Sequence, residues 1–306
     1  MTETTVGPPP LLKHPFRHRL EAAAAYVVFG ALKYLPIGVA SGFGAWLGRA
    51  VGPWTGAHRT AARNLARALP ERTAEEQVHI LRQAWDNFGR TMMEYAVLPR
   101  LARESIAGTA EHIIVEGYEA VAALTAQGKP AILFGAHLGN WETVPPALAR
   151  TVKPMTIVYR PPNTPLVDKL IGDIRGGYTA GMAAKGSSGT RQLVKAMNDG
   201  ALVFMVVDQK NNTGMEIPFF GRGAFTGPGV VRIAMRFNCP VFPVRTERLD
   251  GAKFKVTIEA PWTFPPDGSD DDVRAALTRI NQRLEDWIRA RPGQWLWMHK
   301  RWPKES

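Results

Sequence analysis

From residue 113 onward, short apolar runs alternate with stretches in which apolar residues recur at helical spacing. The apolar runs predict β-strands at residues 113–115, 131–134, 155–158, 201–207, 241–244 and 254–258. The helical patterns lie at residues 119–127, 141–150, 165–174, 190–198 and 230–238. Such alternation is typical of an α/β fold with helices on both faces of a sheet. Because residues 201–207 are apolar without a break, we expect that strand to be buried on both sides.

Helical patterns also flank this alternating segment. Residues 56–105 look helical throughout, with Arg59, Arg63 and Arg67 on one face. That row could face phosphate groups or simply meet solvent, and the pattern does not decide between them. A long helix is predicted at residues 271–291, followed by a tail that interleaves tryptophans with basic residues. The tryptophans fit an interfacial belt, a surface that stacks on bases, or the edge of a core.

The N-terminal region has a different pattern. An apolar stretch at residues 22–32 is interrupted at Lys33 and Pro36 and resumes at residues 37–47. A membrane-spanning helix needs about 20 continuous apolar residues, so neither half is long enough by itself. Together the halves could form one kinked span, a re-entrant hairpin, an interfacial helix, or a buried pair that packs on the rest of the protein. We favour an anchor that lies on the membrane.

The charge of the chain narrows the range of partners. A formal net charge of +11 predicts attraction to polyanions, which could be nucleic acid, an anionic membrane or a soluble acidic protein. No zinc-finger spacing, dense basic block or RNA-reading aromatic motif is present, so we expect no nucleic-acid partner. The single cysteine, Cys239, excludes an internal disulfide and a zinc site built on several thiolates.

One segment is suited to acid–base chemistry. The predicted strand at residues 131–134 ends at Gly135, and a turn then presents His137. Asn140 is a typical N-cap for a helix that carries Glu142 in its first turn. Imidazole titrates near neutral pH, so His137 could take the proton of a hydroxyl that attacks a thioester. A carboxylate on the other ring nitrogen would fix the tautomer, and Glu142 could reach it only if the chain bends between the two residues.

The sequence of residues 135–142, Gly-Ala-His-Leu-Gly-Asn-Trp-Glu, resembles the signature of the bacterial lysophospholipid acyltransferase superfamily, in its lipid A lauroyl/myristoyl acyltransferase branch. Further segments resemble the same branch in the same order, at residues 87–94, 159–163, 207–209, 218–221, 239–244 and 294–302. The resemblance implies an α/β, glycerolipid-acyltransferase-like fold with a central mixed sheet flanked by helices. It divides the chain into a tail with membrane-associated helices, residues 1–55, and an acyltransferase domain, residues 56–306.

The resemblance also implies a site. His137 would be the general base on the acceptor hydroxyl, and Glu142 would orient it, without a covalent acyl-enzyme. Arg160 would bind a phosphate or carboxylate of the substrate, or close its own loop through an ion pair. Asp208 would accept hydrogen bonds from substrate hydroxyls, or cap the turn that follows it. We expect no metal or other cofactor, because His137 has no second histidine at ligand spacing and no nucleotide-binding glycine motif occurs.

The implied reaction moves a fatty acyl chain from acyl carrier protein to a hydroxyl of a lipid A precursor, at the cytoplasmic face of the inner membrane. Residues 218–221 and 227–229 would line the acyl chain. Both substrates are acidic, which fits the positive net charge. Coenzyme A as donor, or a lysophospholipid, ornithine lipid or glycolipid as acceptor, would need the same chemistry. The chain could also be a hydrolase or a non-catalytic membrane-binding module, although no Gly-x-Ser-x-Gly motif supports the hydrolase.

Overall fold

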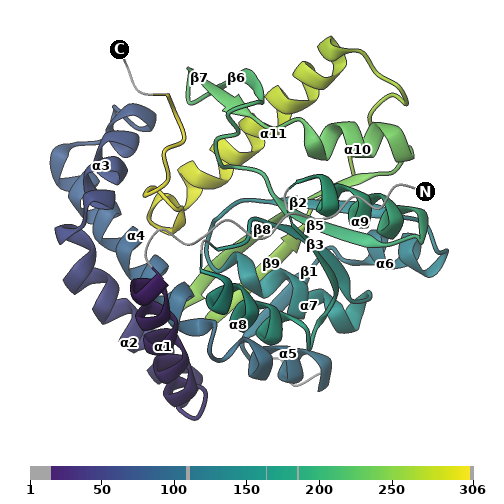
Figure 1. Cartoon of the computed structure of the whole chain (residues 1–306). Helices are drawn as coiled ribbons and strands as arrows, with labels where there is room; N and C mark the ends of the chain where they lie inside the picture. The colour runs from purple at the N-terminus through teal and green to yellow at the C-terminus, as the bar shows by residue number, and fades with distance from the viewer. Residues whose placement is uncertain (1–14, 108–110, 163, 185, 304–306) are drawn as a thin grey trace.

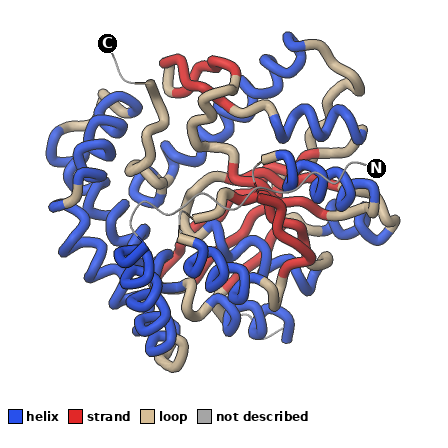
Figure 2. The backbone as a smooth tube through the Cα atoms, in the orientation of Figure 1, coloured by secondary structure: helices blue, strands red, loops and turns tan. Residues whose placement is uncertain are grey.

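The structure is a computed structural model that describes residues 15–107, 111–162, 164–184 and 186–303, and within them a seven-stranded sheet forms the centre of the fold (Figure 1). The spatial order of its strands is β1-β9-β8-β2-β5-β3-β4. Their bounds are β1 Ile113–Glu116, β2 Ala131–Gly135, β3 Met155–Tyr159, β4 Thr179–Ala184, β5 Leu202–Val206, β8 Val241–Asp250 and β9 Lys253–Ile258. Figure 2 shows these strands surrounded by helices.

Strand direction explains where a site can form. Neighbours are parallel across β8-β2-β5-β3-β4 and between β1 and β9, whereas β8 and β9 are antiparallel, so the predicted mixed sheet is confirmed. All of β2 is buried, and so is β5 up to Met205, as expected for strands covered on both faces. The carboxyl ends of β2, β5 and β3 therefore meet at one edge of the sheet, where α/β proteins bind ligands.

Alternate side chains of β2 face two helical layers, as the twofold period of a strand requires. Ile132 and Phe134 pack with α9 (Ser187–Asn198), α10 (Gly229–Phe237) and α11 (Asp270–Ala290). Ala131 and Leu133 pack with α5 (Leu98–Ala107), α6 (Glu119–Ala126) and α7 (Val144–Thr151). A further helix, α8 (Pro165–Arg175), packs beside α5, and the predicted α/β class with helices on both faces is thereby confirmed.

The N-terminal part is helical and interrupted where the sequence predicts. Helix α1 (Pro15–Leu32) is separated from α2 (Ile37–Val51) by Lys33 and Pro36, and residues 1–14 lie outside the described part of the chain. The region predicted as continuous helix is instead three helices, α3 (Gly56–Ala68), α4 (Ala74–Glu94) and α5. A capping box starts α4, because Thr73 and Glu76 each accept a hydrogen bond from the other's main chain.

Helix α2 packs so closely on α4 that their backbones touch, and glycines at the contact make this possible. A Cβ on Gly44 would lie 2.3 Å from the carbonyl oxygen of Gly89, and one on Gly48 would lie 2.1 Å from that of Trp85. One face of α2 is therefore buried against α4, while Phe43 and Trp46 on its other face are exposed. Of the helices in the described residues, none is both long and apolar enough to cross a bilayer.

Three strands are not predicted by the pattern. The edge strand β4 has the sequence Thr-Ala-Gly-Met-Ala-Ala, in which Thr179 is the one β-branched residue and no residue is aromatic, so it carries little of the composition that favours strands. Its pairing with β3 decides its conformation. The hairpin of β6 (Met215–Phe219) and β7 (Arg222–Thr226) contains Pro218, a residue that strands tolerate only at edges.

Candidate active site

The carboxyl ends of β2, β3 and β5 surround a cavity of about 450 Å³. His137 follows β2, Gln209 follows β5, Tyr159 is the last residue of β3, and Arg160 comes directly after it. Glu142 and residues of α8 complete its wall. The structure thus brings three of the four predicted site residues, His137, Glu142 and Arg160, to one cavity, and the fourth, Asp208, contacts His137 directly.

Asp208, and not Glu142, is the carboxylate that orients His137. Its Oδ1 atom lies 2.7 Å from Nδ1 of the imidazole, and its Oδ2 atom accepts a 2.9 Å hydrogen bond from the main-chain amide of His137. Trp295 donates a third hydrogen bond to Oδ2, at 2.7 Å. Both oxygens of Asp208 are therefore used within the protein, and the side chain is only 2% exposed. Asp208 does not line the cavity, so its predicted contact with substrate hydroxyls stays a prediction that this arrangement does not support.

The parallel pairing of β2 with β5 brings these two residues together. Gly135 and Val206 are register partners, so His137 and Asp208 each lie two residues beyond a matched pair. Burial opposes ionisation of Asp208, but the His137 ring and the hydrogen bonds from His137 and Trp295 outweigh it and lower the pKa of the carboxyl below its usual range. An ionised Asp208 keeps the proton on Nδ1 of a neutral imidazole, which leaves Nε2 as the proton acceptor.

The Nε2 atom lies beside the cavity. The His137 side chain is 14% exposed, and the amide nitrogen of Gln209 is 3.4 Å from Nε2. The ring of Trp141 packs edge-on against the imidazole, with 4.7 Å between ring centroids. His137 is therefore held on several sides while one nitrogen can meet a substrate.

Glu142 forms a buried ion pair with Arg175, at the end of α8, instead of a hydrogen bond to His137. The guanidinium donates to both carboxylate oxygens, at 2.6 and 3.0 Å, and also to the hydroxyl of Tyr95. Burial would raise the pKa of Glu142, but the charge and hydrogen bonds of Arg175 outweigh it and lower that pKa. The predicted orienting role of Glu142 is thus replaced by one in which it holds Arg175 at the cavity wall.

Local backbone geometry explains why Glu142 turns away from Nδ1. Gly139 has φ of +58°, and a Cβ there would lie 2.7 Å from the carbonyl oxygen of Thr246, so the turn requires glycine. The side chain of Asn140 then accepts a hydrogen bond from the amide of Glu142, which confirms the predicted N-cap. That cap begins a short 3₁₀ turn, Trp141–Thr143, which precedes α7.

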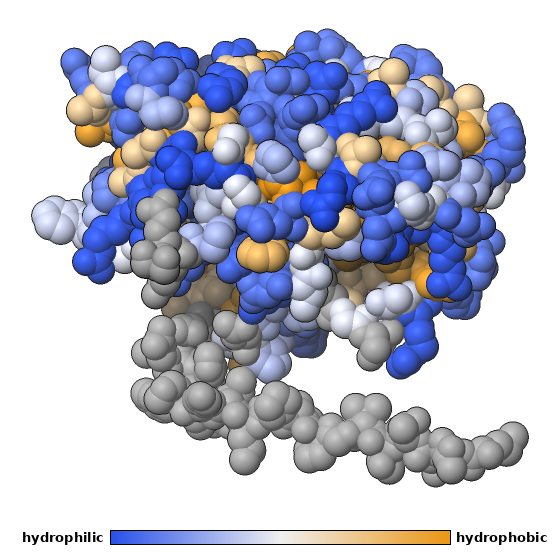
Figure 3. All heavy atoms as spheres, turned by 90° about the horizontal axis from the view of Figure 1, so that it is seen from above, coloured by the Kyte–Doolittle hydropathy of each residue, from blue (hydrophilic) through white to orange (hydrophobic). Residues whose placement is uncertain are grey.

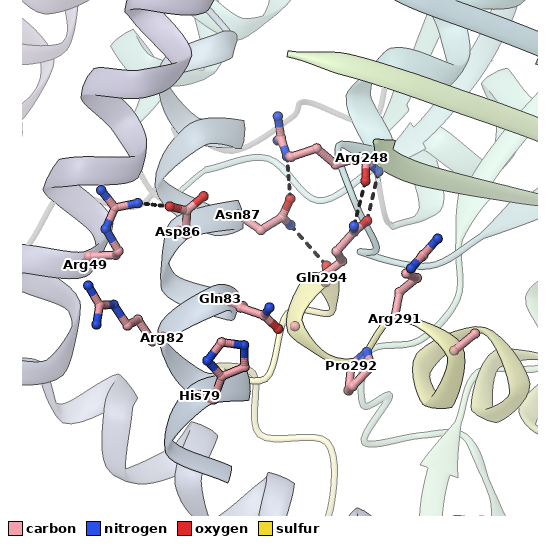
Figure 4. Close-up of a pocket in the computed structure, with 12 residues that line it drawn as sticks. Arg49, His79, Arg82, Gln83, Asp86, Asn87, Arg248, Arg291, Pro292 and Gln294 are labelled. Atoms are coloured by element: carbon pink, nitrogen blue, oxygen red, sulfur yellow. Dashed lines mark hydrogen bonds and ion pairs between the residues drawn. The ribbon is translucent and has the colours of Figure 1, made fainter. Parts of the chain in front are cut away.

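The turn at Gly139 is also held by residues from distant segments, and Figure 4 shows three of them, Asn87, Arg248 and Gln294. The Asn87 side chain donates to the carbonyl oxygens of Gly139 and Gln294, and the amide of Gly139 donates to Gln294. Arg248, at the end of β8, donates to Asn87 and forms a buried ion pair with Glu94. Residues from α4, β8 and the C-terminal tail therefore fix the backbone that carries His137.

Arg160 lines the cavity as predicted, and among the described residues it has no hydrogen-bond or ion-pair partner. Its predicted contact with a substrate anion stays a prediction, whereas the alternative of an ion pair closing its own loop finds no partner in the described part of the chain. Likewise, no group of three His, Cys, Asp or Glu side chains in the described residues is arranged to hold a metal ion.

The family described as bacterial lipid A biosynthesis acyltransferases matches residues 13–304. The chain belongs to this family. It is 25% identical to the lipid A biosynthesis lauroyltransferase of Escherichia coli (strain K12) over 243 residues, 78% of this chain and 76% of that protein. It is 24% identical to the lipid A biosynthesis palmitoleoyltransferase of the same strain over 274 residues, 87% of this chain and 86% of that protein. The chain is therefore an acyltransferase, as the sequence resemblance implies.

A solved structure gives a more distant likeness. The crystal structure of the 1-acyl-sn-glycerophosphate acyltransferase PlsC from Thermotoga maritima aligns with 90% of this chain and 98% of that one, at 12% identity and a TM-score of 0.38.

A second cavity of the acyltransferase, about 440 Å³, adjoins the first between α9 and α10. Val158, Val206 and Gln209 line both, so they form the partition between them. No acidic or basic side chain of the described residues lines the second cavity. Residues 227 and 229 line it, as predicted for an acyl pocket, but residues 218–221 do not, because they form a hairpin that packs on α11 and the C-terminal tail.

Sequence reasoning missed roles for Arg175, Gln209 and Trp295. Arg175 ends a helix, where a basic residue is common for electrostatic reasons, so nothing marked it as buried. Gln209 is adjacent to Asp208 in a segment of the family resemblance, which was a usable signal. Trp295 lies in the tryptophan-rich tail, whose buried Trp295, Trp297 and Trp302 confirm the interpretation as a core edge.

Proposed function

We propose that this acyltransferase transfers a fatty acyl chain from acyl carrier protein to a hydroxyl of a lipid A precursor, with His137 as general base and Asp208 as its orienting carboxylate. The observation that carries the proposal is the 2.7 Å contact between Asp208 and Nδ1, which leaves Nε2 as the proton acceptor beside the cavity. The names of the similar proteins support lipid A as the acceptor class.

In the proposed step, the acceptor hydroxyl oxygen attacks the carbonyl carbon of the thioester while Nε2 takes the hydroxyl proton. A new C–O bond forms, and the carbonyl electrons move onto oxygen. The C–S bond breaks when the tetrahedral intermediate collapses, and the imidazolium returns its proton to the leaving thiolate. Asp208 stabilises the imidazolium between these events, because its carboxylate lies against the Nδ1 proton.

The two adjoining cavities suit the two substrates. The acceptor headgroup would lie in the cavity that contains Arg160 and Arg175, where a guanidinium can bind phosphate oxygens. The acyl chain would lie in the uncharged cavity between α9 and α10. Gln209 stands at the partition, 3.4 Å from Nε2, so the thioester carbonyl would be placed beside its amide. The net charge of +11 favours approach of an acidic carrier protein.

We also propose that the acyltransferase works at the cytoplasmic face of the inner membrane, held by α1 and α2. Ten of the fourteen large hydrophobic residues that the structure describes as exposed lie between Tyr26 and Trp54. The face of the molecule shown in Figure 3 is mostly hydrophilic. Exposed tryptophans such as Trp46 and Trp54 are suited to the membrane interface. Trp46→Ala combined with Phe43→Ala should weaken vesicle binding, and unchanged binding would contradict this location.

The test of the reaction is transfer of a labelled acyl chain from acyl carrier protein to a lipid A precursor in detergent micelles. His137→Ala should lower the rate by about 100-fold or more, the scale of a lost general base. Cys239→Ala, a substitution outside the site, is the matched control. If the enzyme acylates a different lipid and not the lipid A precursor, the proposed acyl transfer stands but the proposed acceptor is wrong. Full activity in His137→Ala would overturn the mechanism.

A further inference from the structure

A groove of about 640 Å³ lies between α1, α5 and α8, away from the catalytic cavity. Its walls are apolar, formed largely by Phe29 and Tyr34 from the N-terminal region and by Leu170 and Ile174 from α8. It opens in the part of the molecule where the exposed apolar side chains gather. An apolar hydrocarbon chain could therefore pass from a membrane into the groove without crossing a polar surface.

Three cations stand in the lining of this groove, Lys33, Arg100 and Arg103, and none of the described residues that line it is acidic. Within the described part of the chain, the side chain of Arg100 donates only to the carbonyl oxygen of Leu35, and Lys33 lies 4.8 Å from the ring centroid of Tyr34. Within the described residues, the side chain of Arg103 makes no hydrogen bond or ion pair. Among the described residues that line the groove, no carboxylate balances its positive charge.

The cleft drawn in Figure 4 also gathers arginines, but most of them are already paired with carboxylates. It is lined by Arg49, Arg248 and Arg291 among others. Each of these three pairs with a carboxylate, Arg49 with Asp86, Arg248 with Glu94 and Arg291 with Glu247. Arg82 also lines the cleft and makes no ion pair with a described residue. An anion entering that cleft would have to compete with those carboxylates. The groove beside α1 has no such competitor among its lining residues.

We infer that this groove binds one molecule of an anionic phospholipid, with an acyl chain against its apolar walls and the phosphate against Lys33, Arg100 and Arg103. Long basic side chains can lie along apolar surface while their charged ends meet a headgroup. The lipid is neither the donor nor the acceptor of the proposed reaction, so the inference goes beyond that function. A soluble anion would leave the apolar walls without a partner, and a zwitterionic lipid would leave the cations without a net charge to balance.

The groove is separated from the catalytic cavity by one helix. Leu170 and Ile174 of α8 line the groove, whereas Ile171 and Arg175 of the same helix line the catalytic cavity. Just before α5, Ala96 lines the groove and its neighbour Tyr95 lines the catalytic cavity. A bound lipid would therefore pack on the back of the helix that carries Arg175.

The test measures lipid retention by native mass spectrometry of the full chain, purified in detergent with phosphatidylglycerol or phosphatidylcholine. We expect one phosphatidylglycerol per protein and little phosphatidylcholine. Gly30→Leu should abolish retention, because Gly30 lines the groove and a Cβ there meets no atom within 4 Å, so the added side chain fills the groove without straining the fold. Gly38→Leu is the matched control, since its Cβ position on α2 is equally open.

Two double variants, each of which removes two positive charges, test the contact with the headgroup. Lys33→Gln with Arg103→Gln should weaken phosphatidylglycerol binding by about fivefold per charge removed. Arg63→Gln with Arg236→Gln removes the same two charges from exposed positions on α3 and α10, and should bind as the wild type does. This readout needs no acyl transfer, so the proposed reaction could fail while the lipid site stands.

Three results would overturn the inference. Equal retention of the two lipids would show that charge plays no part. Wild-type retention in Gly30→Leu would place the lipid elsewhere. A dimer mass in the wild type, lost in Gly30→Leu and without bound lipid, would assign the groove to a second copy of the chain.

Discussion

His137 and Asp208 lie 71 residues apart in sequence, yet they occupy equivalent positions, two residues past the register partners Gly135 and Val206. Parallel pairing of β2 with β5 is therefore what assembles the acid–base pair. The main-chain amide of His137 and the side chain of Trp295 hold the second oxygen of Asp208, so the carboxylate is fixed against the imidazole.

Asp208→Asn should lower kcat by about 100- to 10,000-fold with a small effect on KM, because the amide no longer favours the tautomer with Nε2 unprotonated. Steady-state acyl transfer measures this. Trp295→Phe, which removes only one of the three hydrogen bonds to Asp208, should show a smaller loss. An Asp208→Asn enzyme with wild-type kcat would rule out the orienting role.

Glu142→Gln and Arg175→Met should each lower the free energy of unfolding by about 3–5 kcal/mol, because each leaves one buried charge without its partner. The double variant Glu142→Leu/Arg175→Met should lose less than the sum of the two. Urea denaturation gives these values. If Glu142→Gln were instead fully stable but inactive, Glu142 would act in the chemistry and not chiefly on Arg175.

The stabilising effect of Glu142 should depend on pH in one direction. Its pKa is lowered in the folded protein, so its carboxylate contributes stability that is complete above the unfolded pKa of about 4.3 and lost as pH falls through the folded pKa. The difference in unfolding free energy between wild type and Glu142→Gln should thus be constant at neutral pH and shrink in acid. A difference that grows as pH falls would contradict this sign.

Gly229→Leu should shift donor preference toward shorter acyl chains. Gly229 lines the uncharged cavity, and a Cβ at this position meets no atom within 4 Å, so leucine would occupy space otherwise filled by the chain. Competition between donors of different length measures the shift. Gly56→Leu, at the start of α3 and equally open, is the control. Unchanged selectivity in Gly229→Leu would place the chain elsewhere.

Gly89→Ala should destabilise the protein by about 1–3 kcal/mol through overpacking, because its Cβ would lie 2.0 Å from the carbonyl oxygen of Gly44. Gly42→Ala, on the same helix as Gly44 but with no atom within 4 Å of its Cβ, should be stabilising by about 0.5–1 kcal/mol. Thermal unfolding of the two variants separates the effects. Equal melting temperatures would mean that α2 does not pack on α4 at this distance.

Much of the fold could be predicted because its elements carry local signals. Continuous apolar runs marked β2 and β5, whose side chains face two helical layers. Thr73 and Glu76 form a capping box that the sequence displays as Thr-x-x-Glu, so the break before α4 has a local signal that helical spacing alone does not show. By contrast, β4 has no strand pattern of its own, since only its pairing with β3 makes it a strand.

The candidate site also has some features that could be predicted from neighbouring residues and others that could not. His137 after a buried strand and Asn140 as an N-cap follow from neighbouring residues, and both predictions are confirmed. The partner of His137 was predicted wrongly, because sequence proximity favoured Glu142 over Asp208. The direction of the Glu142 side chain depends on Arg175, which a helix pattern cannot show to be buried.

The sequence by itself determined the α/β architecture, the position of His137 after a buried strand and the family resemblance, because each depends on periodicity or on residues close together in the chain. The tertiary structure alone decided which carboxylate serves His137, which arginine holds Glu142, and where the two cavities meet. Those contacts depend on strand register and helix packing between distant segments, and hydrophobic pattern specifies that such segments pack without specifying which polar side chains then meet.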